Sequence, residues 1–217
     1  MDLDDFIQCV QLIISQCSNE DRHAAESRIS SIVEMQGIVT VFCEALPTVE
    51  EMMLFFICIG LQRIIWKRWR YLSNDEKQLL LTTISSMLLE RGDSLQQYAR
   101  GKLEQVMANV CAQLGSVDPV VEILQKCESE DAENHRKSII GLSVLRGVLD
   151  EVLNKDDPRL TPEQQKTITK SANTRIVPAT TLACSALERE LSESSTIMNS
   201  FHNAELNTNM LEIQSQV

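Results

Sequence analysis

The segment from Thr48 to Leu114 decides the fold, and it begins with TVEEMMLFFICIGLQRII at residues 48–65. Thr48-Val-Glu-Glu51 matches a capping box, in which a Thr or Ser hydroxyl accepts a hydrogen bond from the first turn and a Glu reaches back to the cap. We therefore expect a helix to begin at Thr48. The run from Met52 to Ile65 is apolar on nearly all sides, which predicts that this helix lies inside a layered structure.

Two further helices follow this one with similar start signals. Ser73-Asn-Asp-Glu76 and Ser94-Leu-Gln-Gln97 are both capping boxes, and Gly92 and Gly115 stand where the two helices should end. The helix after Ser94 carries Leu, Ala, Val, Met and Tyr98 at helical spacing. The first helix ends in cations that would face the negative end of its own dipole, namely Arg63, Lys67, Arg68 and Arg70.

The rest of the chain also predicts helices. Their signals are apolar residues at helical spacing, with caps and prolines at the ends. The first expected helix is Asp2–Gln16. The second is capped by Asn19, continues or restarts after Gly37, and stops at Pro47. After the central segment we expect a helix that starts at Asp118-Pro119 and reaches Cys127, a helix over His135–Leu153, and a helix that starts at Thr161-Pro-Glu-Gln164. The chain therefore belongs to the all-α class.

The long helices recur at a regular interval. Starts near Asp2, Thr48, Ser94 and Asn134 are separated by 46, 46 and 40 residues. HEAT and armadillo arrays repeat every 40 to 47 residues or so, with one antiparallel helix pair per unit. We therefore expect an α-solenoid of antiparallel helix pairs, a HEAT/armadillo-like superhelix. The alternative is an ordinary helical bundle whose helix lengths coincide.

This reading divides the chain into two parts. Residues 1–170 are expected to form a HEAT-like array of about four helix pairs. Residues 171–217 are rich in Ser, Thr, Asn and Gln, and we expect a polar C-terminal segment with one possible helix near 180–194, partly flexible.

Composition narrows the classes of function. The chain has 217 residues, 43% of them hydrophobic and only 4% aromatic, and a formal net charge of −11, which argues against general nucleic-acid binding and favours basic protein partners. The acidic start Met1-Asp-Leu-Asp-Asp5 does not resemble a signal peptide, and the apolar run from Met52 to Ile65 is too short to span a membrane. Seven cysteines without a CxxC pair are expected as reduced thiols of an intracellular protein, with Cys9 and Cys17 in the core of one helix.

No constellation of catalytic residues is present. His23, His135 and His202 are far apart in the sequence and do not form a metal-ligand pattern, and phosphate-binding glycine loops are absent. We therefore expect a protein that is not an enzyme, with no catalytic, cofactor-binding or metal-ligating residues and no cofactor.

Two stretches resemble a known family. Trp69-Arg-Tyr-Leu-Ser-Asn-Asp-Glu-Lys77 and Tyr98-Ala-Arg-Gly-Lys-Leu-Glu-Gln-Val-Met-Ala108 resemble the N-terminal HEAT repeats of the importin-beta superfamily (karyopherins), most of all exportins of the profilin-actin exporting type. The resemblance is best from about Ala24 to Leu153. It implies protein partners, with the GTPase Ran and nuclear-pore proteins as candidates, no nucleic acid or membrane, and a location in nucleus and cytoplasm.

Other interpretations stay open beside this one. The chain is several-fold shorter than a complete exportin, so a truncated, inactive fragment is one alternative, and a general helical-repeat scaffold or protein-interaction adaptor is another. The resemblance does not identify the cargo or the residues that bind a partner. The ten acidic residues among residues 1–60, against Arg22 and Arg28, could attract a basic partner or could simply form a charged outer face.

Two groups of basic or aromatic residues have structural explanations. The basic cluster with Trp66 and Trp69 could contact nucleic acid, but in an acidic chain a structural role with Trp69 packed between repeats is favoured. Arg100 and Lys102 lie in an apolar helix, where they would form inter-repeat hydrogen bonds or extend their charged ends to solvent.

Overall fold

The structure is a computed structural model that describes residues 2–15, 17–126, 142–147, 150 and 160–175. This part of the chain is all-α: it contains helices and connecting turns, and no strand. Its elements are α1 (Asp2–Ile14), α2 (Asn19–Val33), α3 (Ile38–Ala45), α4 (Glu51–Arg68), the 3-10 helix η1 (Trp69–Tyr71), α5 (Asn74–Arg91), α6 (Gln97–Leu114) and α7 (Asp118–Lys126). Residues 142–147, 150 and 162–175 are also helical.

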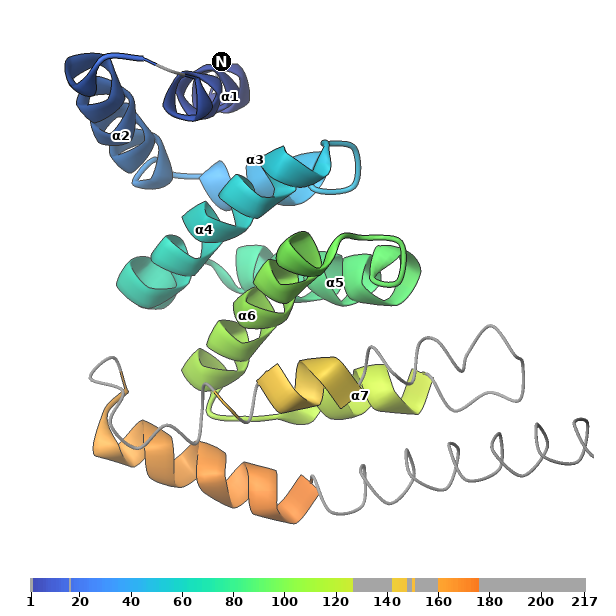
Figure 1. Cartoon of the computed structure of the whole chain (residues 1–217). Helices are drawn as coiled ribbons and strands as arrows, with labels where there is room; N and C mark the ends of the chain where they lie inside the picture. Colours follow the sequence, from blue (N-terminus) through green and yellow to red (C-terminus); the bar gives the residue numbers. More distant parts are fainter. Residues whose placement is uncertain (1, 16, 127–141, 148–149, 151–159, 176–217) are drawn as a thin grey trace, which may run out of the picture.

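The helices alternate between two layers along the chain (Figure 1). α2, α4 and α6 follow one another in one layer, and α1, α3, α5 and α7 follow one another in the other. α4 and α6 occupy equivalent places and begin 46 residues apart, as the sequence period predicts. The start at Asp2 was wrongly placed in this series, because α1 lies in the opposite layer and packs on α2 and α3.

The predicted capping box at Ser73 is confirmed, and the predicted helix start at Thr161 also has one. Ser73 Oγ accepts from Glu76 N at 3.1 Å, and the Glu76 carboxylate accepts from Ser73 N at 2.9 Å. Thr161 and Gln164 form the same reciprocal pair, with distances of 3.2 and 3.0 Å. Each box satisfies backbone N–H groups that a helix start leaves without partners.

The predicted boxes at Thr48 and Ser94 are wrong. α4 is capped by Glu50 and α6 by Gln96, and neither cap makes a side-chain hydrogen bond. The Thr48 hydroxyl instead donates to Ala45 O at 3.0 Å, and the Ser94 hydroxyl donates to Arg91 O at 2.9 Å. Both hydroxyls therefore bind carbonyl groups at the end of the preceding helix, which also accept hydrogen bonds from backbone N–H groups of the connecting turn.

Other helix ends differ from expectation by a few residues. α1 ends at Ile14, and Ser18 rather than Asn19 caps α2, by accepting from Asp21 N at 3.1 Å. The chain restarts as α3 after Gly37, whose φ of 78° suits glycine. As predicted, α5 ends at Gly92 and α6 at Gly115, the latter in the left-handed conformation.

Several expectations concern residues outside the described ranges. Of the expected helix His135–Leu153, only 142–147 and 150 are described, and they are helical. The helix at 162–175 crosses residue 170, where the repeat array was expected to end. Residues from 176 onward, including the expected helix near 180–194, lie outside the described residues.

α4 supplies the centre of the buried core. Its inner face is fully buried and packs against neighbours in both layers; it consists of Leu54, Ile57, Cys58, Leu61, Ile64 and Ile65. At Gly60 the contact with α3 is so close that an added Cβ would lie 2.9 Å from Phe42 Cε2. Phe42 in turn meets Phe6 of α1 edge-on at 4.9 Å between ring centroids.

Candidate protein-binding surface

The outer face of α4 is apolar although it faces solvent. Met52 is 47% exposed and Ile59 is 39% exposed, and between them Phe55 and Phe56 are half-buried. These residues share one face because helix positions three, four and seven apart lie above one another. The prediction that α4 lies inside the structure is therefore correct for one face and wrong for the other.

α6 extends this apolar surface. Tyr98, which we expected on the apolar inner side of α6, is 44% exposed, and its ring meets Phe55 at 5.9 Å between centroids. We call Met52, Phe55, Ile59 and Tyr98 the α4–α6 ridge. Exposed apolar residues that adjoin one another on a soluble protein often mark a binding surface.

Polar contacts fix α6 beside α4 along the ridge. Gln62 Nε2 donates to Gln105 Oε1 at 3.3 Å, and Lys102 Nζ donates to the same oxygen at 2.8 Å. Lys102 Nζ also lies 5.6 Å from the centroid of the Phe55 ring, within range of a cation–π interaction. For Lys102 the structure shows a hydrogen bond within α6 and a ring contact to α4, in place of the inter-repeat hydrogen bond that was one of the two expectations. Arg100 pairs with Glu104 in the same helix, at 3.6 Å.

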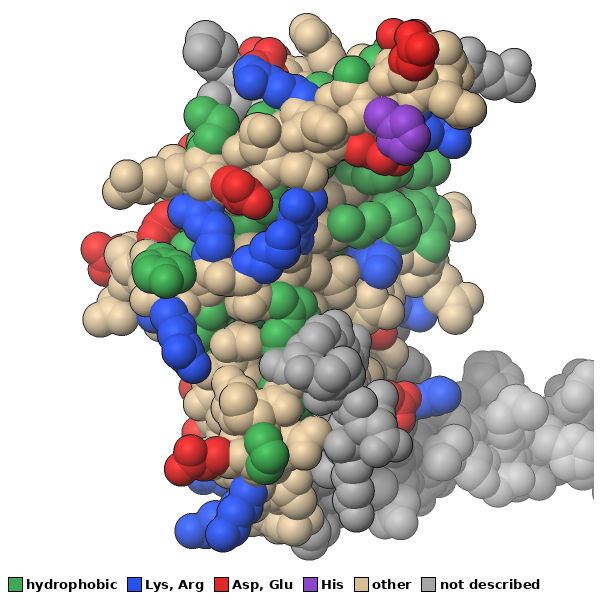
Figure 2. Space-filling view, turned by 90° about the vertical axis from the view of Figure 1, so that its left-hand side faces the viewer, with side chains coloured by type: hydrophobic (Ala, Val, Ile, Leu, Met, Phe, Trp, Pro, Cys, Tyr) green, Lys and Arg blue, Asp and Glu red, His purple; other side chains and the backbone are tan. Residues whose placement is uncertain are grey.

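Beyond the ridge, the outer face of α4 becomes cationic. Arg63 is half-buried and donates to Ser30 Oγ of α2 at 2.7 Å, while Lys67 is exposed, as is Arg70 in η1. Figure 2 looks at the side of the molecule where α4 ends, and Lys and Arg side chains gather near the middle of that face. The candidate surface thus changes from apolar to positive along a single helix.

Arg68 does not act on the α4 dipole as predicted. Its guanidinium donates to Val33 O at 3.1 Å and to Met35 O at 3.0 Å, both at the C-terminal end of α2. Arg68 therefore satisfies the free carbonyl groups of a neighbouring helix rather than those of its own. Trp69 is buried, with Lys77 Nζ of α5 at 5.4 Å from its ring centroid, which agrees with the structural role expected for this tryptophan.

The acidic surplus at the N-terminus is mostly exposed. Glu20, Glu34 and Glu44 are among its exposed members, on three different segments. Asp5 pairs with Arg28 at 2.7 Å, and Glu51 accepts from Gln96 N at 3.3 Å. The structure therefore spreads these carboxylates over the surface of α1 to α4 and does not gather them into one site.

The cysteines and histidines form no reactive centre in the described ranges. No three His, Cys, Asp or Glu side chains there are placed to hold a metal ion. His23 is exposed and faces Glu26 at 3.4 Å, whereas His135 and His202 lie outside the described residues. Burial raises the pKa of the Cys43 thiol to about 11 and that of Cys111 to about 12. These thiols stay protonated, and so unreactive, near neutral pH.

Cys9 and Cys17 differ from expectation. Both are only partly buried, and Cys17 lies after the end of α1 rather than on the same helix as Cys9. The prediction that both belong to the core of one helix is therefore wrong. Cys127 and Cys184 lie outside the described residues.

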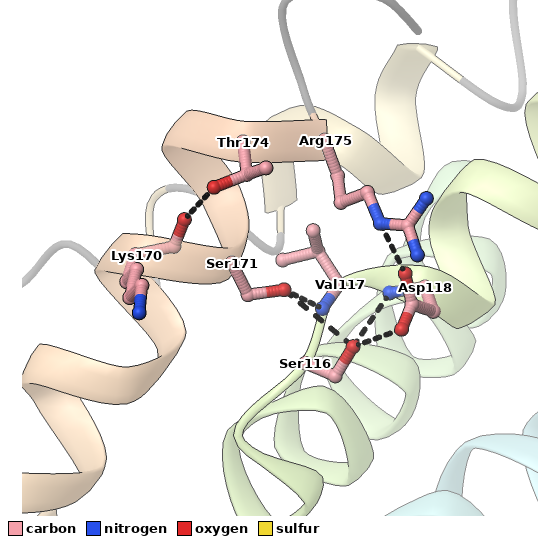
Figure 3. Close-up of polar contacts among 7 residues, drawn as sticks. All are labelled: Ser116, Val117, Asp118, Lys170, Ser171, Thr174 and Arg175. Atoms are coloured by element: carbon pink, nitrogen blue, oxygen red, sulfur yellow. Dashed lines mark hydrogen bonds and ion pairs between the residues drawn. The ribbon is translucent and has the colours of Figure 1, made fainter.

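A polar cluster joins the helix at 162–175 to the start of α7 (Figure 3). Val117 N donates to Ser171 Oγ at 3.2 Å, and Arg175 Nε pairs with Asp118 Oδ1 at 3.1 Å. Asp118 was expected as the helix cap, but it is the first residue of α7, and its own N–H donates to Ser116 Oγ at 3.1 Å. Beside the cluster, Thr167 Cγ2 would lie 3.2 Å from a Cβ placed on Gly115. These contacts fix the position of the helix at 162–175. Because the polar groups of the cluster bind one another, the α4–α6 ridge is the better candidate for a binding surface.

Comparisons with known protein families, with curated proteins and with solved structures find no match for this chain. None of the helices in the described ranges is both long and apolar enough to cross a bilayer. The arrangement of the helices and the α4–α6 ridge are the features of the molecule that bear on its function.

Proposed function

We propose that the chain is a HEAT-like α-solenoid and acts as a protein-binding module related to nuclear transport receptors of the importin-beta superfamily. Its candidate partner is the GTPase Ran, with nuclear-pore proteins as further candidates. In this proposal the protein works in nucleus and cytoplasm, binds neither nucleic acid nor membrane, and catalyses no reaction.

The alternation of helices between two layers supports the solenoid. In such arrays each helix pair buries its apolar face only by stacking on the next pair. α2, α4 and α6 stack in this way on one side and α3, α5 and α7 on the other. The 46-residue spacing between α4 and α6 lies within the range of HEAT repeats.

The α4–α6 ridge is the observation that carries the binding role. It consists of adjoining apolar and aromatic side chains on two neighbouring helices, and Met52, Ile59 and Tyr98 are each more than a third exposed. Interfaces are enriched in Tyr, Phe and Met relative to the rest of a protein surface. A module that binds proteins accounts for this ridge without further assumptions.

Calorimetry with purified Ran tests the transport-receptor part of the proposal. The chain is titrated with Ran loaded with a non-hydrolysable GTP analogue and, separately, with GDP, at two salt concentrations. We expect binding to be selective for the GTP form and weaker at high salt, because the acidic N-terminal part would contribute electrostatic attraction.

Charge-reversal variants locate that attraction. Glu34→Lys and Glu44→Lys change exposed carboxylates in the acidic N-terminal part, and Glu122→Lys makes the same change at an exposed position on α7. We expect the first two to weaken binding to Ran and the third to leave it nearly unchanged. If the chain keeps its helical circular dichroism but binds Ran in neither nucleotide state, the general scaffold or the inactive fragment is favoured instead.

A further inference from the structure

The outer face of α4 changes character from one end to the other. Met52, Phe55 and Ile59 make its first two turns apolar, and Arg63 and Lys67 make its last turns cationic. From Met52 to Lys67 the face is about 22 Å long at 1.5 Å per residue. That length matches about four turns of a second helix laid along it.

α6 widens the surface on one side. Phe55 meets Tyr98, and seven residues further along each helix Gln62 meets Gln105, so α4 and α6 run side by side in the same direction. A helix lying along α4 would therefore also contact the Tyr98 ring and the Lys102 ammonium group. Lys102 thus adds a positive charge to the surface that already carries Arg63 and Lys67.

The cations at the end of α4 have few acidic partners. Lys67 and Arg70 form no ion pair within the described ranges, and Arg63 donates to the neutral hydroxyl of Ser30. The chain as a whole carries a formal charge of −11, so a positive surface is a local exception. The charge of this surface is complementary to carboxylates on a partner.

A second copy of the chain does not fit the same surface. If two α4 faces met in parallel, Lys67 would lie against Lys67, and if they met antiparallel, the cations would lie against the apolar turns. Like charges in contact and desolvated unpaired charges both oppose association. The surface is therefore suited to a different molecule.

We propose that the α4–α6 ridge binds an amphipathic helix from a partner protein, about four turns long. The apolar side of that helix covers Met52, Phe55 and Ile59, and carboxylates near one of its ends pair with Arg63 and Lys67. Helices that place an apolar face on a hydrophobic surface are a recurrent mode of peptide recognition. This inference rests on the proposed role as a binding module, and it does not depend on Ran as the partner.

Fluorescence anisotropy with synthetic peptides tests the proposal on the full chain. The probe is a labelled peptide of about 16 residues with leucines on one helical face and two glutamates in its last turn. One matched peptide has lysines in place of the glutamates, and a second has the same composition in an order without an apolar face. We expect the acidic peptide to bind saturably and at least about tenfold more tightly than either control.

Variants of the chain sharpen the test. Ile59→Asn should weaken binding of the acidic peptide at least about tenfold. Lys67→Glu should reverse the preference, so that the lysine peptide binds more tightly than the glutamate peptide. Tyr71→Asn is the control, because Tyr71 is 83% exposed and lies outside the ridge.

Three results of the peptide titrations would overturn the inference. They are equal binding of all three peptides, no saturable binding of the acidic peptide, and binding that Ile59→Asn does not alter. Self-association of the chain that Ile59→Asn abolishes would also overturn it, in favour of a second copy. The Ran titration separates the two proposals, because acidic-peptide binding without Ran binding leaves this inference standing and removes the transport role.

Discussion

α4 and α5 are both 18 residues long and are separated only by η1 and a short turn, yet their solvent-facing sides differ. The exposed positions of α5 are polar: Asn74, Asp75, Gln78, Thr82 and Glu90. The exposed positions of α4 include Met52 and Ile59. α5 therefore shows that a helix of this stack can have a polar outer face. An apolar outer face on α4 is what the proposed binding role requires.

The comparison predicts that the two faces of α4 respond differently to truncation, and this is the largest effect we expect. Leu61 is fully buried, so Leu61→Ala should lower the free energy of unfolding by about 2–5 kcal/mol through lost burial and a residual cavity. Ile59→Ala on the outer face should change it by less than about 1 kcal/mol. Urea unfolding followed by circular dichroism measures both. Equal losses would show that the outer face also serves stability.

The next effect concerns close packing at Gly60. A Cβ at this position would lie 2.9 Å from Phe42 Cε2, so Gly60→Ala requires the fully buried Phe42 ring or the α4 backbone to shift. We expect a net loss of about 1–3 kcal/mol, even though alanine favours a helix more than glycine. Gly101→Ala in α6 is the matched control, because nothing lies within 4 Å of a Cβ there. The same urea titration should show that this control is neutral or stabilising.

The free energy of unfolding should also depend on pH, by a similar or smaller amount, because of the Cys58 thiol on the inner face of α4. Burial raises the pKa of the Cys58 thiol well above its ordinary value of 9.0, whereas the thiol of the unfolded chain ionises near that value. Above pH 9 the unfolded state therefore binds fewer protons, and stability falls as pH rises. Between pH 8 and 10, Cys58 should account for a loss of about 1 kcal/mol.

The variant Cys58→Ala isolates this contribution. Its own cavity lowers stability at every pH, but its further loss between pH 8 and 10 should be smaller than that of the unmodified chain. α5 contains no cysteine, so no thiol of that helix adds to this slope. An unchanged slope in the variant would assign the pH dependence to other groups.

The smallest effect concerns the starts of the two helices. The capping box of α5 is formed, so Ser73→Ala should cost about 1 kcal/mol. Thr48 is exposed and does not cap α4, and its hydroxyl donates only to Ala45 O, so Thr48→Ala should cost less than about 0.5 kcal/mol. Thermal unfolding of the two single variants, scanned under identical conditions, makes the comparison. A larger loss for Thr48→Ala would contradict the hydrogen bonds seen at these two joints.

The sequence predicted the helices well because their apolar periodicity is local information. Each of the seven α-helices α1 to α7 corresponds to a predicted helix, and the capping residues Ser73, Gly92 and Gly115 were identified correctly. The boxes at Thr48 and Ser94 failed for a physical reason. A hydroxyl between two helices can serve the end of the first or the start of the second, and the letters of the sequence do not distinguish these outcomes.

The candidate surface could not be found in the same way. A helix that is apolar all round predicts complete burial, and only the packing reveals that Met52 and Ile59 are partly exposed to solvent. The contact of Phe55 with Tyr98 joins residues 43 positions apart, so no local pattern contains it. Arg68 is a similar case, because its partners at Val33 and Met35 belong to a different helix.

The two hydrogen bonds from Arg68 bear on how the molecule opens locally. Helix ends ordinarily fray, so their backbone amides exchange with deuterium faster than those of the helix centre. At the end of α2, however, opening would also release the guanidinium group that is fixed at the end of α4. The last turn of α2 should therefore exchange as one cooperative unit with α4, and its protection should report on the integrity of a helix that begins 18 residues further along the chain.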